Sequence, residues 1–199
     1  MAADSAGRTN QKRRTRKALL EAAARLMREG RSPSFEEVAE AALVSRATAY
    51  RYFPGVEPLL IEAALDLEMP AADAILVDAS DDPLARLRRV DAAMQAMIRA
   101  NEPALRRMLI HSLEQGLGGA TDLPLRQNRR TPLIEAALEP ARDRFSPEAF
   151  DRLAKALALV VGTESTLVFK DVLRVSNAEA DALRAWMIRA LLLVAEAGG

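Results

Sequence analysis

The stretch 43-LVSRATAYRYFPG-55 carries both tyrosines of the chain, with two arginines and a phenylalanine, in a sequence that is only 4% aromatic. Ser45 is a suitable helix N-cap and the closing proline-glycine pair is a stop signal, so a short helix is predicted over 45–52. Directly before it, 34-SFEEVAEAA-42 has a glutamate three residues after Ser34, a capping box that predicts another short helix. The sequence therefore predicts two short helices joined by a tight turn.

A segment with helical apolar periodicity over 15–29 precedes them, and the three helices together match a helix-turn-helix. In that arrangement the second short helix enters the major groove of DNA with its first residues toward the bases. Arg46 can then donate two hydrogen bonds to guanine, Ala47 can contact a thymine methyl group, and Thr48 can reach a base or a phosphate. Phe53 is predicted to pack inward. Tyr50, Arg51 and Tyr52 suit phosphate contacts. The predicted DNA-binding residues are Arg13, Arg14, Lys17, Ser34, Ser45, Arg46, Ala47, Thr48, Tyr50, Arg51 and Tyr52. The alternative is a small amphipathic helix whose aromatic residues only fill the core.

Charge is balanced over the whole chain but not along it. Residues 1–55 hold eleven Lys or Arg against six Asp or Glu, and five of these cations lie in 12-KRRTRK-17. Such an asymmetry is typical of a small module that binds a polyanion. The basic segment is predicted to be an arm that reaches the DNA backbone or minor groove, through Arg8, Lys12, Arg13, Arg14, Arg16 and Lys17. A solvated terminal arm is the alternative.

Composition argues against several other functions. The absence of cysteine excludes disulfides and thiolate chemistry, and a single histidine argues against a His-based metal site or a Ser-His-Asp triad. No two acids stand in a recognisable catalytic spacing, so neither an enzyme nor a cofactor is expected. No leader peptide is visible and the longest apolar runs are too short for a bilayer, so a cytoplasmic protein is expected.

Helical patterns continue to the end of the chain. The predicted helices beyond the helix-turn-helix are 56–69, 83–100, 103–117, 124–144, 147–173 and 177–197. No segment alternates in the manner of a strand, so the fold class is all-α with about nine helices.

The segment 38-VAEAALVSRATAYRYFPGVEPLL-60 resembles the signature of the TetR family of bacterial transcriptional repressors. The matching residues are Val38, Ala39, Ala42, Val44, Ser45, Thr48, Tyr50, Tyr52, Phe53 and Leu59. Further along, 133–140 resembles the family's seventh helix and 162–192 its closing helix pair. The resemblance implies an N-terminal three-helix helix-turn-helix DNA-binding domain over 1–55. It also implies a C-terminal helical ligand-binding and dimerisation domain over 56–199.

Two positions depart from the family pattern. Leu43 stands where the family has a turn glycine, and a left-handed residue other than glycine costs on the order of 1 kcal/mol. Val56 stands where the family commonly has a lysine that contacts a phosphate. These departures motivate an alternative function, a TetR-fold adaptor or co-regulator that acts through protein contacts with weak or lost DNA binding.

The family dimerises through its last two helices, and one stripe of the final helix is apolar here. The predicted dimer-interface residues are Leu157, Val161, Leu183, Met187, Ala190, Leu191 and Val194. A ligand cavity is implied among helices four to eight, where methionine-rich walls adapt to varied shapes and a histidine and a glutamate can anchor polar groups. The predicted ligand-binding residues are Met94, Met97, Met108, His111, Glu164, Phe169 and Trp186. A monomeric core and ordinary core packing are the alternatives for the two sets.

The resemblance thus implies a ligand-responsive repressor that binds a pseudo-palindromic operator as a homodimer and is released by a largely apolar small molecule. The protein is expected to be located in the bacterial cytoplasm, in association with the nucleoid. No metal or cofactor is expected to take part.

Overall fold

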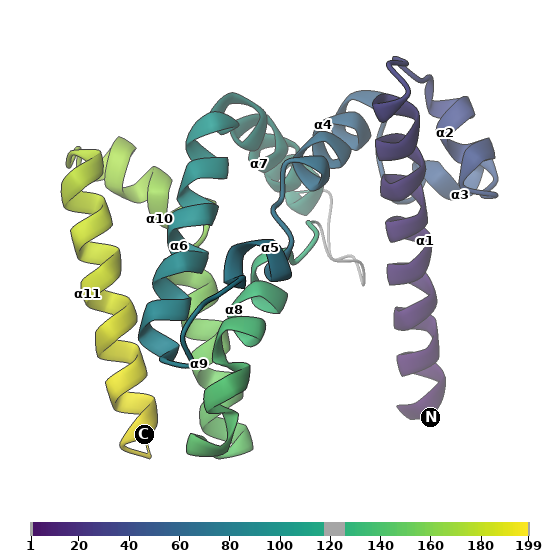
Figure 1. Ribbon diagram of the computed structural model, residues 1–199. Helices are drawn as coiled ribbons and strands as arrows, with labels where there is room; N and C mark the ends of the chain where they lie inside the picture. The colour runs from purple at the N-terminus through teal and green to yellow at the C-terminus, as the bar shows by residue number, and fades with distance from the viewer. Residues whose placement is uncertain (1, 118–125, 199) are drawn as a thin grey trace. The chain divides into compact units, whose positions relative to one another are not determined.

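The computed structural model describes residues 2–117 and 126–198, and the described residues form helices and connecting segments without a strand (Figure 1). The chain divides into two compact units. Unit 1 comprises Met1–Glu68 and Asn101–Gln127, and unit 2 comprises Met69–Ala100 and Asn128–Gly199. The predicted all-α fold class, with an N-terminal helix-turn-helix, is confirmed.

Unit 1 is built on a long first helix. Its helices are α1 (Ala2–Arg28), α2 (Phe35–Ala41), α3 (Arg46–Tyr50), α4 (Val56–Leu67) and α7 (Glu102–Leu117). Helix α1 packs against α2 and α4, α2 packs against α3, and α4 packs against α7. Figure 1 shows α2 and α3 lying beside the C-terminal part of α1. The buried core of this unit includes Leu19, Leu20, Ala23, Val38, Ala39, Ala49, Phe53, Leu59 and Ala63.

Helix α1 ends where the sequence predicts it to end. Gly30 has a φ of 76°, and its N–H donates to the carbonyl of Met27 at 3.0 Å. The N–H of Arg31 donates to the carbonyl of Leu26 at 3.3 Å. Together these two bonds form a Schellman motif, in which the glycine takes the left-handed conformation at no steric cost.

The start of α1 differs from the prediction. The helix begins at Ala2 rather than near residue 15, so the basic segment 12-KRRTRK-17 lies on a helix and is not an extended arm. Lysine, arginine and glutamine are good helix formers, and no proline interrupts the sequence before α1 ends. The apolar periodicity marks only the part of the helix that packs.

Unit 2 holds the remaining helices. They are α5 (Ala72–Leu76), α6 (Pro83–Ala100), α8 (Arg130–Leu138), the 3-10 helix η1 (Glu139–Arg144), α9 (Pro147–Val160), α10 (Thr163–Leu167), the π-helix η2 (Val168–Val172) and α11 (Asn177–Glu196). Helix α11 packs against α6 and α9, and α8 packs against α6 and α9 (Figure 1). Fully buried side chains of this unit include Leu87, Ile98, Ile134, Leu138, Leu157 and Ile188.

Several helix boundaries in unit 2 follow local signals. Asp82 caps α6, because its carboxylate accepts a hydrogen bond from the N–H of Ala85 at 2.9 Å. Ser146 and Ser176 cap α9 and α11 in the same way.

Other boundaries in unit 2 differ from the prediction. The helix predicted over 147–173 is interrupted at Gly162, whose backbone is extended at the N-cap of α10. The helix predicted over 124–144 begins at Arg130 and becomes 3-10 where Pro140 lacks an N–H. The start of that prediction, 124–125, lies outside the described residues. Helix α5 has no predicted counterpart.

The division by packing also differs from the boundary expected after residue 55. Helices α4 and α7 belong to the compact unit that contains the helix-turn-helix, because α4 packs along α1 and α7 packs on α4. The division of function between a DNA-binding part and a ligand-binding part stays a prediction.

A buried polar network lies among α6, α10 and α11 of unit 2. The guanidinium Nε of Arg184, a residue only 1% exposed, is 3.2 Å from a carboxylate oxygen of Asp91. Gln95 donates to Asp91 at 3.4 Å and to the carbonyl of Val161 at 3.3 Å, and accepts from the hydroxyl of Thr166 at 3.1 Å. Burial is the largest influence on the Asp91 carboxyl and raises its pKa above the usual value of 3.8, although the charge of Arg184 acts in the opposite direction.

Candidate nucleic-acid interface

The turn between α2 and α3 retains a left-handed residue. Leu43 has a φ of 57°, its N–H donates to the carbonyl of Glu40 at 2.9 Å, and the N–H of Val44 donates to that of Ala39 at 2.9 Å. This is again a Schellman motif, with a leucine at the position that favours glycine. The Leu43 side chain is 95% exposed, so it adds no core contact to offset the steric cost of the conformation.

The capping serines hold the two short helices in the predicted way. The hydroxyl of Ser34 accepts from the N–H of Glu37 at 3.2 Å, and the Glu37 carboxylate accepts from the N–H of Ser34 at 2.8 Å. These hydrogen bonds, above all that from the Ser34 backbone, lower the pKa of Glu37. Ser45 caps α3 by accepting from the N–H of Thr48 at 3.2 Å, and its hydroxyl donates to that of Thr48 at 2.9 Å. Contacts of both serines with DNA stay predictions.

Helix α3 presents a polar face to solvent. Arg46, Ala47, Tyr50 and Arg51 are exposed, whereas Thr48 and Tyr52 are half-buried. Phe53 is 2% exposed, as predicted for a residue that packs inward.

The Tyr50 side chain is packed on one side and exposed on the other. Its ring packs against Phe35 of α2 with a centroid distance of 4.4 Å, while 44% of the residue remains exposed. Tyr50 therefore helps to hold α3 on α2 and can still offer its hydroxyl to a ligand.

The guanidinium of Arg46 is held by two neighbours. Its Nη1 lies 2.9 Å from Oε1 of Glu36 on α2, and its Nη2 donates to the Tyr50 hydroxyl at 3.5 Å. The guanidinium carbon is 5.5 Å from the centroid of the Tyr50 ring. The hydrogen bond to Tyr50, followed by the charge of Glu36, raises the pKa of Arg46.

Glu36 carries no signal of its own in the sequence. It stands ten residues before Arg46, and no helical spacing joins the two. Only the fold of the α2–α3 pair brings them into contact.

The basic residues of α1 divide into two groups. Arg13, Arg14 and Lys17 are exposed on the helix surface, where they can contact a polyanion. Arg16 is 7% exposed, and its two terminal nitrogens each lie 2.6 Å from a carboxylate oxygen of Glu62 on α4. Its guanidinium also lies 4.6 Å from the centroid of the Phe53 ring. The expected DNA contact by Arg16 is therefore wrong, because the side chain ties α1 to α4.

The residues predicted to bind a ligand are distributed over both units. Met108 and His111 lie on α7 of unit 1, and the other five lie in unit 2. His111 is half-buried, with Nδ1 3.5 Å from a carboxylate oxygen of Glu114.

In unit 2, the ligand-binding candidates have different surroundings. Met94, Met97 and Phe169 are buried. Glu164 pairs with Arg130 at 2.8 Å. Trp186 is 69% exposed on α11, so the structure places it on the surface of its unit rather than among buried residues. The role of all these residues in ligand binding stays a prediction.

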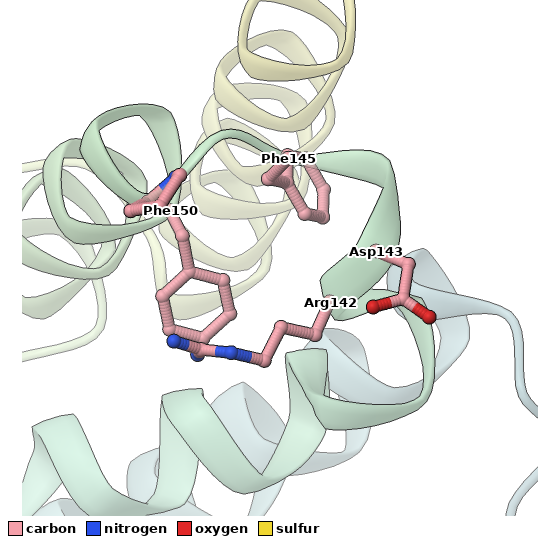
Figure 2. A pocket seen from close by; sticks show the side chains of 5 residues that line it. Arg142, Asp143, Phe145 and Phe150 are labelled. Carbon is pink, nitrogen blue, oxygen red and sulfur yellow. The ribbon is translucent and has the colours of Figure 1, made fainter.

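A pocket of about 310 Å³ opens in unit 2 where η1 meets α9. Figure 2 shows the guanidinium of Arg142 beside the Phe150 ring, 4.1 Å from its centroid. Phe145 meets Phe150 edge to face, and Asp143 and Pro147 complete the lining. None of these residues belongs to the predicted ligand-binding set. Their only signal in the sequence is two phenylalanines close together in a chain that has five.

The predicted dimer-interface residues also divide by exposure. Leu157 and Val161 are at most 1% exposed, because they fill the core of their own chain, and the structure therefore contradicts a direct interface role for them. Leu183 and Val194 are exposed on α11, and Met187, Ala190 and Leu191 are half-buried there. Other exposed apolar residues, outside the predicted interface set, lie on α9, η2 and α11, and they are Leu159, Val168, Val172, Trp186 and Leu193.

Within residues 2–117 and 126–198, no helix is both long and apolar enough to cross a membrane. The same residues contain no cluster of His, Asp or Glu suited to a metal ion.

The fold and exposed face of α3 define a helix-turn-helix protein of the DNA-binding type. Residues 19–63, from the middle of α1 into α4, match the family model described as "Bacterial regulatory proteins, tetR family". The match confirms the resemblance over these residues and supports a TetR-family transcriptional regulator. Searches of curated proteins and of solved structures gave no significant match.

Proposed function

We propose that the protein is a homodimeric repressor that binds a pseudo-palindromic operator in the bacterial cytoplasm and is released by a small, largely apolar effector. The observation that carries this proposal is the exposed face of α3, on which Arg46, Ala47 and Tyr50 surround the N-terminal turn. A helix of this kind reads bases with its first residues. Arg46 has the donors for a guanine, and the methyl of Ala47 suits a thymine.

Backbone contacts would fix the register on the operator. Arg51 lies at the end of α3, and Arg13, Arg14 and Lys17 are exposed on α1 of the same unit. Cations of this kind neutralise phosphates and make affinity fall steeply as salt is raised.

The exposed apolar side chains of α11 support a dimer. Leu183, Trp186, Leu193 and Val194 are between 37% and 69% exposed, a large apolar area for one helix of a monomer. A dimer places two reading helices about 34–36 Å apart and so explains how a short helix gains specificity.

Release by an effector needs a difference in affinity between two states. A hundredfold loss of operator affinity corresponds to about 2.7 kcal/mol of coupling. The buried methionines and the polar network of unit 2 suit an adaptable, mostly apolar site with a few polar anchors.

Selection of operators from random DNA by the purified protein tests the proposal. We expect a pseudo-palindromic consensus, and we expect Arg46→Ala to lose about ten- to hundredfold in affinity for it, the value of a bidentate base contact. Arg152→Ala, which removes an exposed arginine of α9, is the matched control and should bind as the wild type does. Tyr50→Phe keeps the packing on Phe35 and is therefore a better probe of the hydroxyl than Tyr50→Ala.

A second function is favoured by one observation. Leu43 is almost fully exposed beside α3, and an exposed leucine suits a protein partner better than a phosphate. An adaptor would yield no consensus in the selection and would show no salt-dependent DNA binding, although the protein is folded.

A further inference from the structure

The Glu36–Arg46 ion pair places a negative charge beside the side chain best suited to read a base. Both side chains are about half exposed, at 51% and 62%, so the pair lies on the surface of the α2–α3 unit. An exposed ion pair contributes little to folding stability, about 0–1 kcal/mol, and stability alone gives little reason for it. Its position matters more, because DNA bound by α3 must meet both charges.

Sequence-independent binding is weakened by this arrangement. It depends on cations that neutralise phosphates, and Glu36 already neutralises Arg46 in the free protein. A phosphate that approaches Arg46 also approaches the Glu36 carboxylate, and like charges at close range repel each other. The pair therefore disfavours a phosphate as the partner of Arg46.

A guanine is a different partner for the same side chain. Its O6 and N7 are neutral acceptors, and a guanidinium has five N–H donors in a fixed plane. Glu36 takes Nη1, and the contact of Nη2 with Tyr50 is at the 3.5 Å limit of a hydrogen bond, so the second edge of the guanidinium is easily given to a base. Glu36, with the Tyr50 ring centroid 5.5 Å from the guanidinium carbon, thus holds the guanidinium in place in advance, which reduces the entropy lost on binding.

We infer that Glu36 is a positioning residue for sequence selectivity: it holds Arg46 ready for a base edge and suppresses its use as a phosphate contact. This inference rests on the proposed DNA-binding function. It predicts that the ratio of operator affinity to random-DNA affinity depends on the pair rather than on either residue alone.

The test is a double-mutant cycle with Glu36→Gln, Arg46→Ala and the double variant. Each is titrated with the selected operator and with a scrambled duplex of the same composition over a range of salt concentrations. Glu36→Gln should raise affinity for the scrambled duplex several-fold, steepen its salt dependence by about one phosphate contact, and lower the selectivity ratio by about tenfold. In the Arg46→Ala background the same change should leave the selectivity ratio unaltered.

Glu40→Gln is the matched control. Glu40 is exposed on α2 one turn after Glu36, so this change removes the same charge from the same helix without removing the contact with Arg46. Equal gains from Glu36→Gln and Glu40→Gln, or a loss of selectivity that persists without Arg46, would show a general charge effect and overturn the inference. Failure of the wild type to bind any duplex would instead overturn the proposed function. Thermal melts of every variant confirm that folding is unchanged.

Discussion

At the scale of single residues, Leu43 is the clearest departure from what its backbone position favours. A leucine at a φ of 57° with a side chain 95% exposed has the steric cost of the left-handed region and no packing in return. Leu43→Gly is therefore expected to raise the free energy of unfolding by about 1 kcal/mol. Urea denaturation measures the free energy of unfolding of this variant. Ala42→Gly is the control: the backbone of Ala42 is right-handed, so glycine relieves no strain there and the variant should be less stable than the wild type. If Leu43→Gly also weakens operator binding, the leucine contacts a partner.

Arg16 is the residue whose role the sequence could not reveal. It stands in a run of cations, yet its guanidinium is buried against Glu62, 46 positions away. Arg16→Met removes one partner of a buried pair and should cost about 3–5 kcal/mol in unfolding free energy. Arg14→Met, at an exposed neighbouring position, should change it by less than about 0.5 kcal/mol. Equal effects of the two changes in chemical denaturation would contradict the buried ion pair.

At the scale of secondary-structure elements, Gly162 separates α9 from α10. A Cβ there would lie 1.6 Å from Nη1 of Arg130, which donates to the carbonyl of Ala158 and to Glu164. Gly162→Ala should displace the guanidinium and cost about 1–3 kcal/mol in unfolding free energy, the penalty for leaving partly buried groups unpaired. Gly55→Ala is the control, because a Cβ at Gly55 meets nothing within 4 Å. A larger loss at Gly55 in the same denaturation assay would contradict this account.

The same elements show what the sequence could predict. Ser34 and Ser45 are confirmed as caps because a cap depends only on residues three positions away. At Gly162 the guanidinium of Arg130 lies against the break from another helix, and a single sequence does not specify such a contact. For the candidate site, the exposed face of α3 followed from local pattern. Glu36 did not, because its contact with Arg46 exists only after the two helices pack.

At the scale of the whole molecule, the buried carboxyl of Asp91 links the stability of unit 2 to pH. Because burial raises its pKa, the folded state binds this proton more readily than the unfolded state, whose carboxyl titrates near 3.8. The contribution of Asp91 to stability is therefore lost as the pH rises from 3.8 through the raised value. The Asp91→Asn variant has no carboxyl to titrate at this position. As the pH rises from 3.8 through the raised pKa, the unfolding free energy of the wild type should therefore fall relative to that of the variant. A constant difference between their unfolding free energies across the window would contradict the prediction.

At the scale of the assembly, the exposed apolar side chains of α11 are expected to form the dimer interface. Trp186 is 69% exposed in one chain, so Trp186→Glu removes little packing within that chain. In a dimer built on α11, however, the same change would bury a charge without a partner, which costs several kcal/mol. We expect sedimentation velocity to show a dimer for the wild type and a folded monomer for Trp186→Glu. Operator affinity should fall with the loss of the second reading helix.

Glu135→Lys, at an exposed position of α8, is the control for a change of surface charge and should leave the dimer intact. A dimer that survives Trp186→Glu would place the interface elsewhere. The exposed apolar side chains of α11 would then need a different partner.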